Sequence, residues 1–275
     1  MPVMGLVRFS ILFSKQNFFT EMKDKSLEER WQTLFAPARM EARFTYFEAL
    51  TLPSLTAQPE GDWRAVVFYS SEMPAVYRDR LMDMLAPHKH LGAVSVTPDQ
   101  LMSAAIREEL DRYVPDRHRL RASFRLDDDD AMSARFMPQL WELLSTYGAD
   151  QTALSFARGH YLKAEPGEGF RLAESIRNFG IGCGLTLIGK GRNKRDVYNL
   201  GAPHRRVDQA FPTIADARAP VFLCTAHTRN DSGTGSLRHA QLDKSRIFGP
   251  KELKDRLGPD FAHVDMDALA AFQDH

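Results

Sequence analysis

The sequence predicts an α/β protein with a central mixed sheet, helices on both faces, and antiparallel strands in its second half. Residues 5–147 alternate between short β-rich runs and longer amphipathic segments, a pattern typical of a sheet with parallel strands. Residues 152–227 hold several strand-like runs separated by tight turns. The chain has 275 residues, 43% hydrophobic and 26% charged, which is ordinary for a globular protein that buries a large core.

The first half is expected to hold four strands, each followed by a helix. The strand-like runs are rich in Val and aromatic residues or alternate apolar with polar residues, and the segments after them have apolar positions at helical spacing. One long helical segment contains Pro53, which must kink or end the helix. The expected strands are residues 5–13, 63–71, 91–98 and 118–126, and the expected helices are residues 27–58, 74–87, 99–114 and 131–147.

The second half is expected to be mostly strands. A short helix is predicted at 204–211, and two short amphipathic pieces are predicted from about residue 251 onward. The Gly/Ser-rich stretch 228–236 is predicted to be a mobile loop that closes as a lid over a bound ligand. The expected strands are residues 152–164, 169–175, 181–191, 195–201 and 220–227, with a hairpin tip at 191–196.

Charge and composition narrow the possible partners and location. Lys+Arg and Asp+Glu both number 36, so net charge gives no reason to expect a nucleic-acid or membrane partner. No run of about 18 apolar residues predicts a transmembrane segment, and the apolar N-terminus lacks the features of a signal peptide. Cys183 and Cys224 have no metal-type spacing and are predicted to be reduced thiols. The chain is expected to be cytoplasmic.

Four consecutive aspartates, Asp127–Asp130, follow the strand predicted at 118–126. Ligands bind at the carboxyl ends of strands in parallel sheets, so the run lies where a site is expected. A solvated turn that caps the next helix would explain one or two aspartates, at roughly 0.5–1 kcal/mol each. Four adjacent carboxylates repel one another, and a divalent cation would relieve that repulsion. The run therefore favours a metal site, with the solvated cap as the alternative.

Five stretches carry a resemblance to a known family. They are "VRFSIL" (7–12), "RMEARFTYFEALTLPSLTAQPEGDWRAVVFYSSEMP" (39–74) and "RLDDDDA" (125–131), and less strongly "VYNLGAPH" (197–204) and "VFLCTAHTRN" (221–230). Through them the sequence resembles a family of rhamnosyltransferases, which are glycosyltransferases with the GT-A fold. The resemblance covers roughly residues 5–230 and implies one domain over 1–275 with a GT-A-like (Rossmann-like) sheet. Its parts would be a nucleotide-binding half (1–147), an acceptor-binding half (148–250) and a C-terminal helical tail (251–275).

The resemblance implies a metal-dependent enzyme that moves a sugar, rhamnose by the family's label, from a nucleotide-diphosphate sugar donor to a glycan or small-molecule acceptor. The cofactor would be Mn²⁺ or Mg²⁺. In the D-x-D element of this fold, Asp129 and Asp130 would be metal ligands with His227 completing the site, although Asp130 could instead face the donor sugar or cap the helix. The nucleotide-sugar contacts would be Arg8, Ser70, Arg125, Asp127 and Asp128.

An inverting transfer also needs a group that takes the proton of the acceptor hydroxyl. His204 and Asp208 are the catalytic candidates, with Glu174 as a third. Ser70, in "FYSSE" (68–72), stands near where many GT-A enzymes carry an aspartate for the nucleotide base, so that contact departs from the wider pattern. Two alternatives stay open: a metal-dependent phosphoesterase and a non-catalytic nucleotide- or carbohydrate-binding module.

Overall fold

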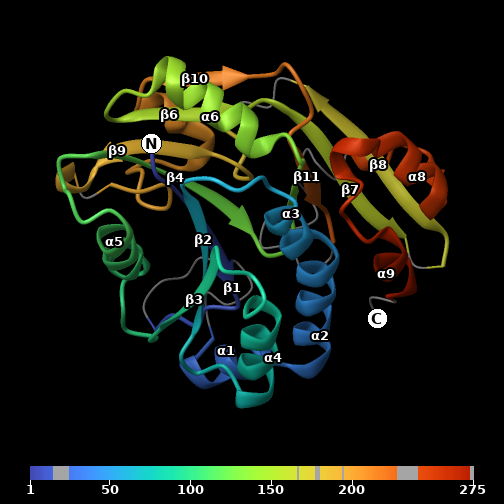
Figure 1. Cartoon of the computed structure of the whole chain (residues 1–275). Helices are drawn as coiled ribbons and strands as arrows, with labels where there is room; N and C mark the ends of the chain where they lie inside the picture. Colours follow the sequence, from blue (N-terminus) through green and yellow to red (C-terminus); the bar gives the residue numbers. More distant parts are fainter. Residues whose placement is uncertain (15–24, 166, 177–179, 194, 228–240, 273–275) are drawn as a thin grey trace.

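In a computed structural model, the chain forms two β-sheets surrounded by helices (Figure 1). The structure describes residues 1–14, 25–165, 167–176, 180–193, 195–227 and 241–272. The predicted loop and lid at 228–236 lie outside the described residues. Among the described residues, no helix has the length and apolar composition needed to cross a lipid bilayer.

The strands divide between a seven-stranded and a five-stranded sheet. The strands of the larger sheet are β1 (Val3–Phe9), β2 (Trp63–Ser70), β3 (Leu91–Val96), β4 (Leu120–Asp127), β6 (Thr152–Phe156), β9 (Thr186–Lys190) and β10 (Thr213–Asp216). Those of the smaller sheet are β5 (Ala131–Met132), β7 (Arg158–Glu165), β8 (Gly169–Ile176), β11 (Phe222–Thr225) and β12 (Ile247–Phe248).

The helices mostly lie between these strands in the sequence. The α-helices are α1 (Leu27–Leu34), α2 (Pro37–Tyr46), α3 (Leu52–Thr56), α4 (Ala75–Leu85), α5 (Met102–Tyr113), α6 (Phe136–Tyr147), α8 (Pro250–Leu257) and α9 (Met266–Ala271). A π-helix, η2 (Phe47–Thr51), joins α2 to α3, and the 3-10 helices are η3 (Gly191–Asn193), η4 (His204–Gln209) and η5 (Pro259–Phe261).

The larger sheet is mixed, in the order β10-β6-β9-β4-β1-β2-β3. Strand β1 pairs in parallel with β2 and β4, and β2 with β3. Strand β9, from the second half, runs antiparallel between β4 and β6. The predicted α/β class, with a central mixed sheet and antiparallel strands in the second half, is confirmed.

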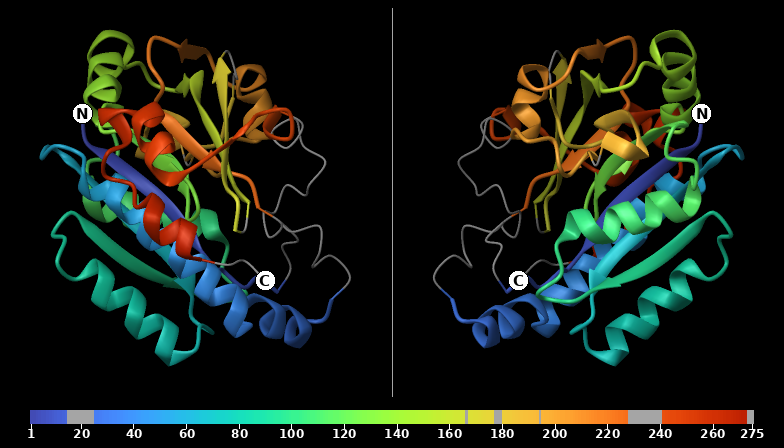
Figure 2. Two further views of the ribbon diagram at one scale, coloured as in Figure 1. Left: turned by 90° about the vertical axis from the view of Figure 1, so that its right-hand side faces the viewer. Right: turned by 90° about the vertical axis from the view of Figure 1, so that its left-hand side faces the viewer.

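Strand β1 shows how helices come to cover both faces. Val3 and Val7 belong to the apolar cluster formed with helices α1 to α4 and α6, while Met4 and Leu6 belong to the cluster formed with α5. This alternation follows from the two-residue repeat of a strand. Figure 2 shows α5 on one side of the parallel strands, and Figure 1 shows α2 and α4 on the other. Strands β1 and β4 carry polar residues at their carboxyl ends, and these residues lie together at one edge of the sheet.

The helix predicted at 27–58 is two helical segments, because the chain breaks before Pro37 and starts α2 there. The second segment continues through Pro53 to Thr56. A proline lacks the N–H of a regular helix, and its ring excludes the carbonyl four residues back. The π-helix just before it widens the turn, and the Leu52 N–H bonds to the carbonyl of Phe47. Pro53 therefore changes the helix register without ending the helix.

The second half departs further from expectation. The strand predicted at 152–164 is two strands, β6 and β7, which belong to different sheets. Residues 195–201 form turns instead of a strand, 191–196 contain the 3-10 helix η3 instead of a simple hairpin tip, and the strand predicted from 181 starts at Thr186. The short helix at 204–211 and the two helices after 250 are confirmed. The short strands β5, β10 and β12 were not predicted.

Candidate functional site

The aspartate run forms a tight turn where the two sheets meet. Strand β4 ends at Asp127 and β5 begins at Ala131, so three residues carry the chain from the larger sheet to the smaller one. Helix α6, expected from residue 131, begins only at Phe136, so the aspartates do not cap it. The three residues Asp128–Asp130 are only 4–5% exposed. The alternative of a solvated helix cap is therefore wrong.

Two arginines from neighbouring strands hold Asp127. Arg8 on β1 lies directly opposite Asp127 on β4, and its Nη2 donates to Oδ1 at 3.1 Å. Arg125, on the same face of β4, donates from Nη2 to Oδ2 at 3.0 Å. Burial opposes ionisation of this carboxyl, but the two guanidinium groups outweigh it and hold the pKa of Asp127 below its usual range. Asp127 is thus a carboxylate shared by two cations.

Tyr198 lies against both arginines. Its ring centroid is 4.8 Å from Cζ of Arg8 and 4.9 Å from Cζ of Arg125, within the range of cation–π interactions. Its hydroxyl donates to the carbonyl of Leu6 at 3.3 Å, and burial raises its pKa to about 12. The stretch "VYNLGAPH" contains Tyr198, but no pattern in the sequence singles this tyrosine out.

The next two aspartates face the other side of the turn. Arg43 donates from Nη1 to Oδ1 of Asp128 at 2.6 Å and lies 3.5 Å from Oδ2 of Asp129. His227 Nε2 donates to the same Oδ2 of Asp129 at 3.0 Å. Burial raises the pKa of Asp128 to about 7, against the effect of Arg43. Burial also opposes ionisation of Asp129, but His227 and Arg43 outweigh it and lower its pKa.

The helical segment α2–η2–α3 supplies three contacts to this turn. Besides Arg43, the ring of Tyr46 stacks on His227 with centroids 4.5 Å apart, and Thr51 Oγ1 donates to the carbonyl of Asp130 at 2.9 Å. All three residues lie in the stretch 39–74 that carries the family resemblance.

Asp130 is directed away from Asp129 and His227. Its Oδ1 accepts the Thr225 N–H at 2.9 Å, and its carboxylate lies with the thiols of Cys183 and Cys224, all ligand atoms within 4.8 Å of one another. Such a set of two thiols and a carboxylate could hold a soft ion, whereas Mg²⁺ and Mn²⁺ prefer oxygen ligands. The structure therefore separates Asp130 from the other two predicted metal ligands. Neither cysteine forms a disulfide, as expected.

Asp129 and His227 offer a carboxylate oxygen and an imidazole nitrogen, donors that suit Mn²⁺. The Asp129 Oδ2 and His227 Nε2 atoms are 3.0 Å apart. This is the distance of their hydrogen bond, so His227 would have to release its Nε2 proton to become a ligand. Among the described residues Asp127 does not join these two in a group of three closely spaced ligand atoms, so Asp129 and His227 fit the ion as two of its ligands.

The other residues predicted for the site include the catalytic candidates His204, Asp208 and Glu174. His204 is partly buried, and its Nδ1 donates to the carbonyl of Gly180 at 2.7 Å. Burial, with a contribution from nearby Arg125, lowers its pKa. Asp208 is exposed on η4, and Glu174 pairs with Arg158 on the smaller sheet.

Ser70 is fully buried at the end of β2, where its Oγ accepts the Glu72 N–H at 3.2 Å. None of the hydrogen bonds described for Ser70, Asp208 or Glu174 reaches the aspartate turn.

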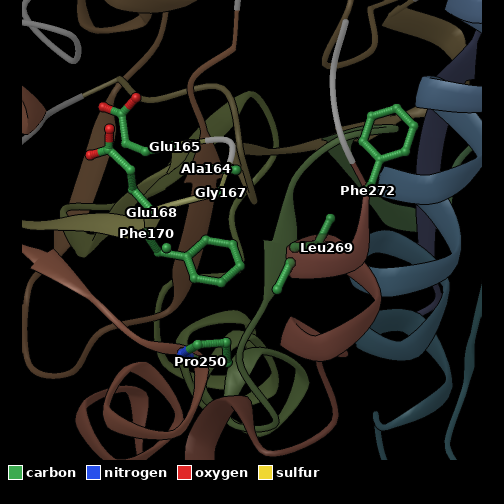
Figure 3. A pocket seen from close by; sticks show the side chains of 10 residues that line it. Ala164, Glu165, Gly167, Glu168, Phe170, Pro250, Leu269 and Phe272 are labelled. Carbon is green, nitrogen blue, oxygen red and sulfur yellow. The ribbon is translucent and has the colours of Figure 1, made fainter.

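A cavity of about 250 Å³ lies between the tip of the β7–β8 hairpin and α9. Phe170, Leu269 and Phe272 form apolar walls, and the carboxylates of Glu165 and Glu168 lie together on the side away from Phe272 (Figure 3). The Phe272 ring also contacts Tyr46, with centroids 6.4 Å apart. Because Tyr46 stacks on His227, two ring contacts separate this cavity wall from the aspartate turn.

Residues 2–239 match the model of the family described as "Putative rhamnosyl transferase". The chain belongs to this family. Its arginine-flanked aspartate turn lies within the matched region. A search among curated proteins found no match.

Solved structures show distant likeness. The S. aureus TarS 1–349 structure is 9% identical, with 82% of this chain and 60% of that one covered, at a TM-score of 0.46. The structure of the same protein in complex with UDP-GlcNAc is 9% identical, with 92% of this chain and 63% of that one covered, at a TM-score of 0.48. A "putative nucleotide-diphospho-sugar transferase" from Desulfovibrio desulfuricans G20 is 10% identical, with 89% of this chain and 95% of that one covered, at a TM-score of 0.35. This chain thus spans about 60% of the length of TarS 1–349.

Proposed function

We propose that this protein is a metal-dependent glycosyltransferase that moves a sugar, with rhamnose as the first candidate, from a nucleotide-diphosphate donor to an acceptor hydroxyl. The observation that carries the proposal is the aspartate turn at the carboxyl end of β4, flanked by cations from β1, β4 and α2 and by His227. Membership of the family supports the reaction class.

In this proposal the two sides of the turn share the donor. Asp129 and His227, with Asp127, would hold Mn²⁺ or Mg²⁺, and Asp127 would also lie next to the ribose. The ion, when bound, supplies a Lewis acid for the charge that develops on the leaving diphosphate. Arg8 and Arg125 add fixed positive charge beside the same group, which stabilises developing charge without reorganisation of solvent.

His204 is the residue we propose as the base for an inverting transfer. A carbonyl only accepts hydrogen bonds, so the contact with Gly180 places the proton on Nδ1 and leaves the Nε2 lone pair to accept one. Its lowered pKa keeps the imidazole neutral near pH 7, as a general base requires. Asp208 is the second candidate, and it is exposed on the same 3-10 helix.

We also propose that the acceptor binds to the half formed by residues 148–250, while residues 1–147 bind the nucleotide. The cavity beside the β7–β8 hairpin supports this division, because its apolar walls and its pair of glutamates could bind the ring and hydroxyl groups of a sugar. The helical tail, 251–275, supplies the opposite wall through Leu269 and Phe272.

Calorimetric titration of UDP, dTDP and GDP, each with and without Mn²⁺, tests the proposal. We expect wild type to bind one of the three in a metal-dependent manner, and Asp129→Asn to lose that binding while remaining folded. Asp79→Asn is a matched control, because it removes an exposed carboxylate on α4 that pairs only with Arg78 in the described contacts.

Absence of nucleotide binding to folded wild type would contradict the proposal. The alternative, a non-catalytic module that binds other ligands, would then be favoured. Metal-dependent release of phosphate from the bound nucleotide would identify a phosphoesterase instead.

A further inference from the structure

The two arginines at the carboxyl edge of the sheet are held in place by more than their pairing with Asp127. The Tyr198 ring lies within 4.9 Å of both guanidinium carbons. A Cβ added at Gly182 would lie 3.3 Å from Cζ of Arg125, so this glycine leaves the room that the guanidinium occupies. The arginine forks are thus positioned before any ligand arrives.

Asp196 fixes the position of Tyr198. Its side chain is fully buried, and its Oδ1 accepts the Tyr198 N–H at 2.8 Å. Burial raises the pKa of this carboxyl to about 6. A buried carboxyl of this kind is costly unless hydrogen-bonded, and here its hydrogen bond sets the turn that carries the tyrosine between the two arginines.

In the described part of the chain, two guanidinium groups share the carboxylate of Asp127. The side chains of Arg8, Arg125 and Asp127 are 25%, 12% and 31% exposed, so solvent reaches the group. Guanidinium forks match the oxygens of a phosphate as well as those of a carboxylate, and a diphosphate carries enough negative charge to satisfy both arginines.

We propose that Arg8, Arg125 and Tyr198 form the binding site for the diphosphate of the donor, and that Asp127 occupies this site until the diphosphate displaces it. The assignment to a donor rests on the proposed function. Displacement exchanges one set of charge-assisted hydrogen bonds for another and frees the Asp127 carboxylate for the ribose or the metal ion. Donor binding and the release of Asp127 are then one event.

Calorimetric titration of inorganic pyrophosphate in the presence of EDTA tests this site without nucleotide, sugar or metal. We expect Asp127→Asn to bind pyrophosphate about tenfold more tightly than wild type, which corresponds to about 1.4 kcal/mol, because the internal competitor has lost its charge. Arg8→Ala and Arg125→Ala should each lose binding at least about tenfold. Asp216→Asn is the matched control, since Asp216 ends β10 at the far edge of the same sheet and pairs with Arg218.

Gly182→Ala is a second variant that alters no charge. Its added methyl group pushes against the Arg125 guanidinium, so we expect it to weaken pyrophosphate binding several-fold in a protein with unchanged circular dichroism. Equal pyrophosphate affinity in wild type and Asp127→Asn, or unchanged affinity in the two arginine variants, would overturn the inference.

The two proposals fail separately. A nucleoside diphosphate that binds with Mn²⁺, in a protein whose Arg8 and Arg125 variants still bind pyrophosphate normally, would leave the glycosyltransferase proposal intact and reject this site. Pyrophosphate binding with the expected variant pattern, without binding of any nucleoside diphosphate, would keep the anion site and reject the donor.

Discussion

Aspartates on the two sides of the aspartate turn differ in solvent exposure, and their pKa values are shifted in opposite directions. On the side of Arg8 and Arg125, Asp127 is 31% exposed and meets two guanidinium groups. On the side of α2, Asp128 is 5% exposed, and its ion pair among the described residues is with Arg43, which it shares with Asp129. The pKa of Asp127 is lowered, whereas that of Asp128 is raised to about 7.

The pKa values of these two adjacent carboxyls therefore differ because different numbers of cations face them and because they retain different amounts of water. The exposed side can exchange its carboxylate for another anion at small cost. The buried side is a structural anchor, because removing a cation there leaves charge in a place that water does not reach.

The strongest way to break this contrast is Arg43→Ala. Loss of the guanidinium leaves Asp128 and Asp129 buried without it, and removing one partner of a buried pair costs about 3–5 kcal/mol. We expect a loss of that size in the free energy of unfolding measured with urea. Arg78→Ala, at an exposed pair with Asp79, should lose less than about 1 kcal/mol. A loss equally small for Arg43→Ala would show that the buried side is no anchor.

Asp128→Asn sharpens the contrast through pH. Because folding raises the pKa of Asp128 from 3.8 to about 7, the folded state binds its proton more tightly, and its contribution to stability falls as pH rises through that interval. Relative to Asp128→Asn, wild type should lose roughly 1 to 3 kcal/mol between about pH 4 and about pH 8. Urea unfolding of both proteins at the two pH values measures this. A difference that does not change with pH would contradict it.

The smallest effect is expected for Asp127→Asn. Its lowered pKa means that the ion pairs stabilise the fold above the unfolded value of 3.8 and that this contribution is lost as pH falls below it. Because the pair is partly exposed, the variant should lose about 1 kcal/mol or less at neutral pH. The same urea titrations, extended below pH 3.8, should show the difference between the two proteins shrinking as pH falls. A loss in the free energy of unfolding as large as that of Arg43→Ala would contradict the difference between the two sides of the turn.

The first half of the fold was predictable because its signals are local. Strands such as β2 and β4 have the composition or the two-residue alternation of a buried sheet, and the helices between them carry apolar faces. The placement of the aspartates at the end of a central strand followed from the same alternation. These patterns depend on neighbours a few residues apart, so the sequence displays them directly.

The second half and the partners of the aspartates depend on contacts between distant residues. The apolar run across Phe156 and Ala157 conceals the point where the chain leaves one sheet for the other. Residues 195–201 have strand-like composition, yet Asp196 folds them into a turn by accepting a backbone N–H. The repulsion that suggested a metal is already relieved by Arg43 and by His227, which lie 85 or more residues away from their partners in the sequence.

The π-helix between α2 and α3 acts as one residue inserted into an otherwise regular helix. It lets Arg43 and Tyr46, before it, and Thr51, within it, all reach the same turn. Each residue of an α-helix advances its side chain by about 100°. In a regular α-helix the eight steps from Arg43 to Thr51 would leave their side chains about 80° apart around the helix axis. The wider π-helical turn reduces that offset, so both side chains contact the aspartate turn, and the π-helix is as much a part of the site as its side chains.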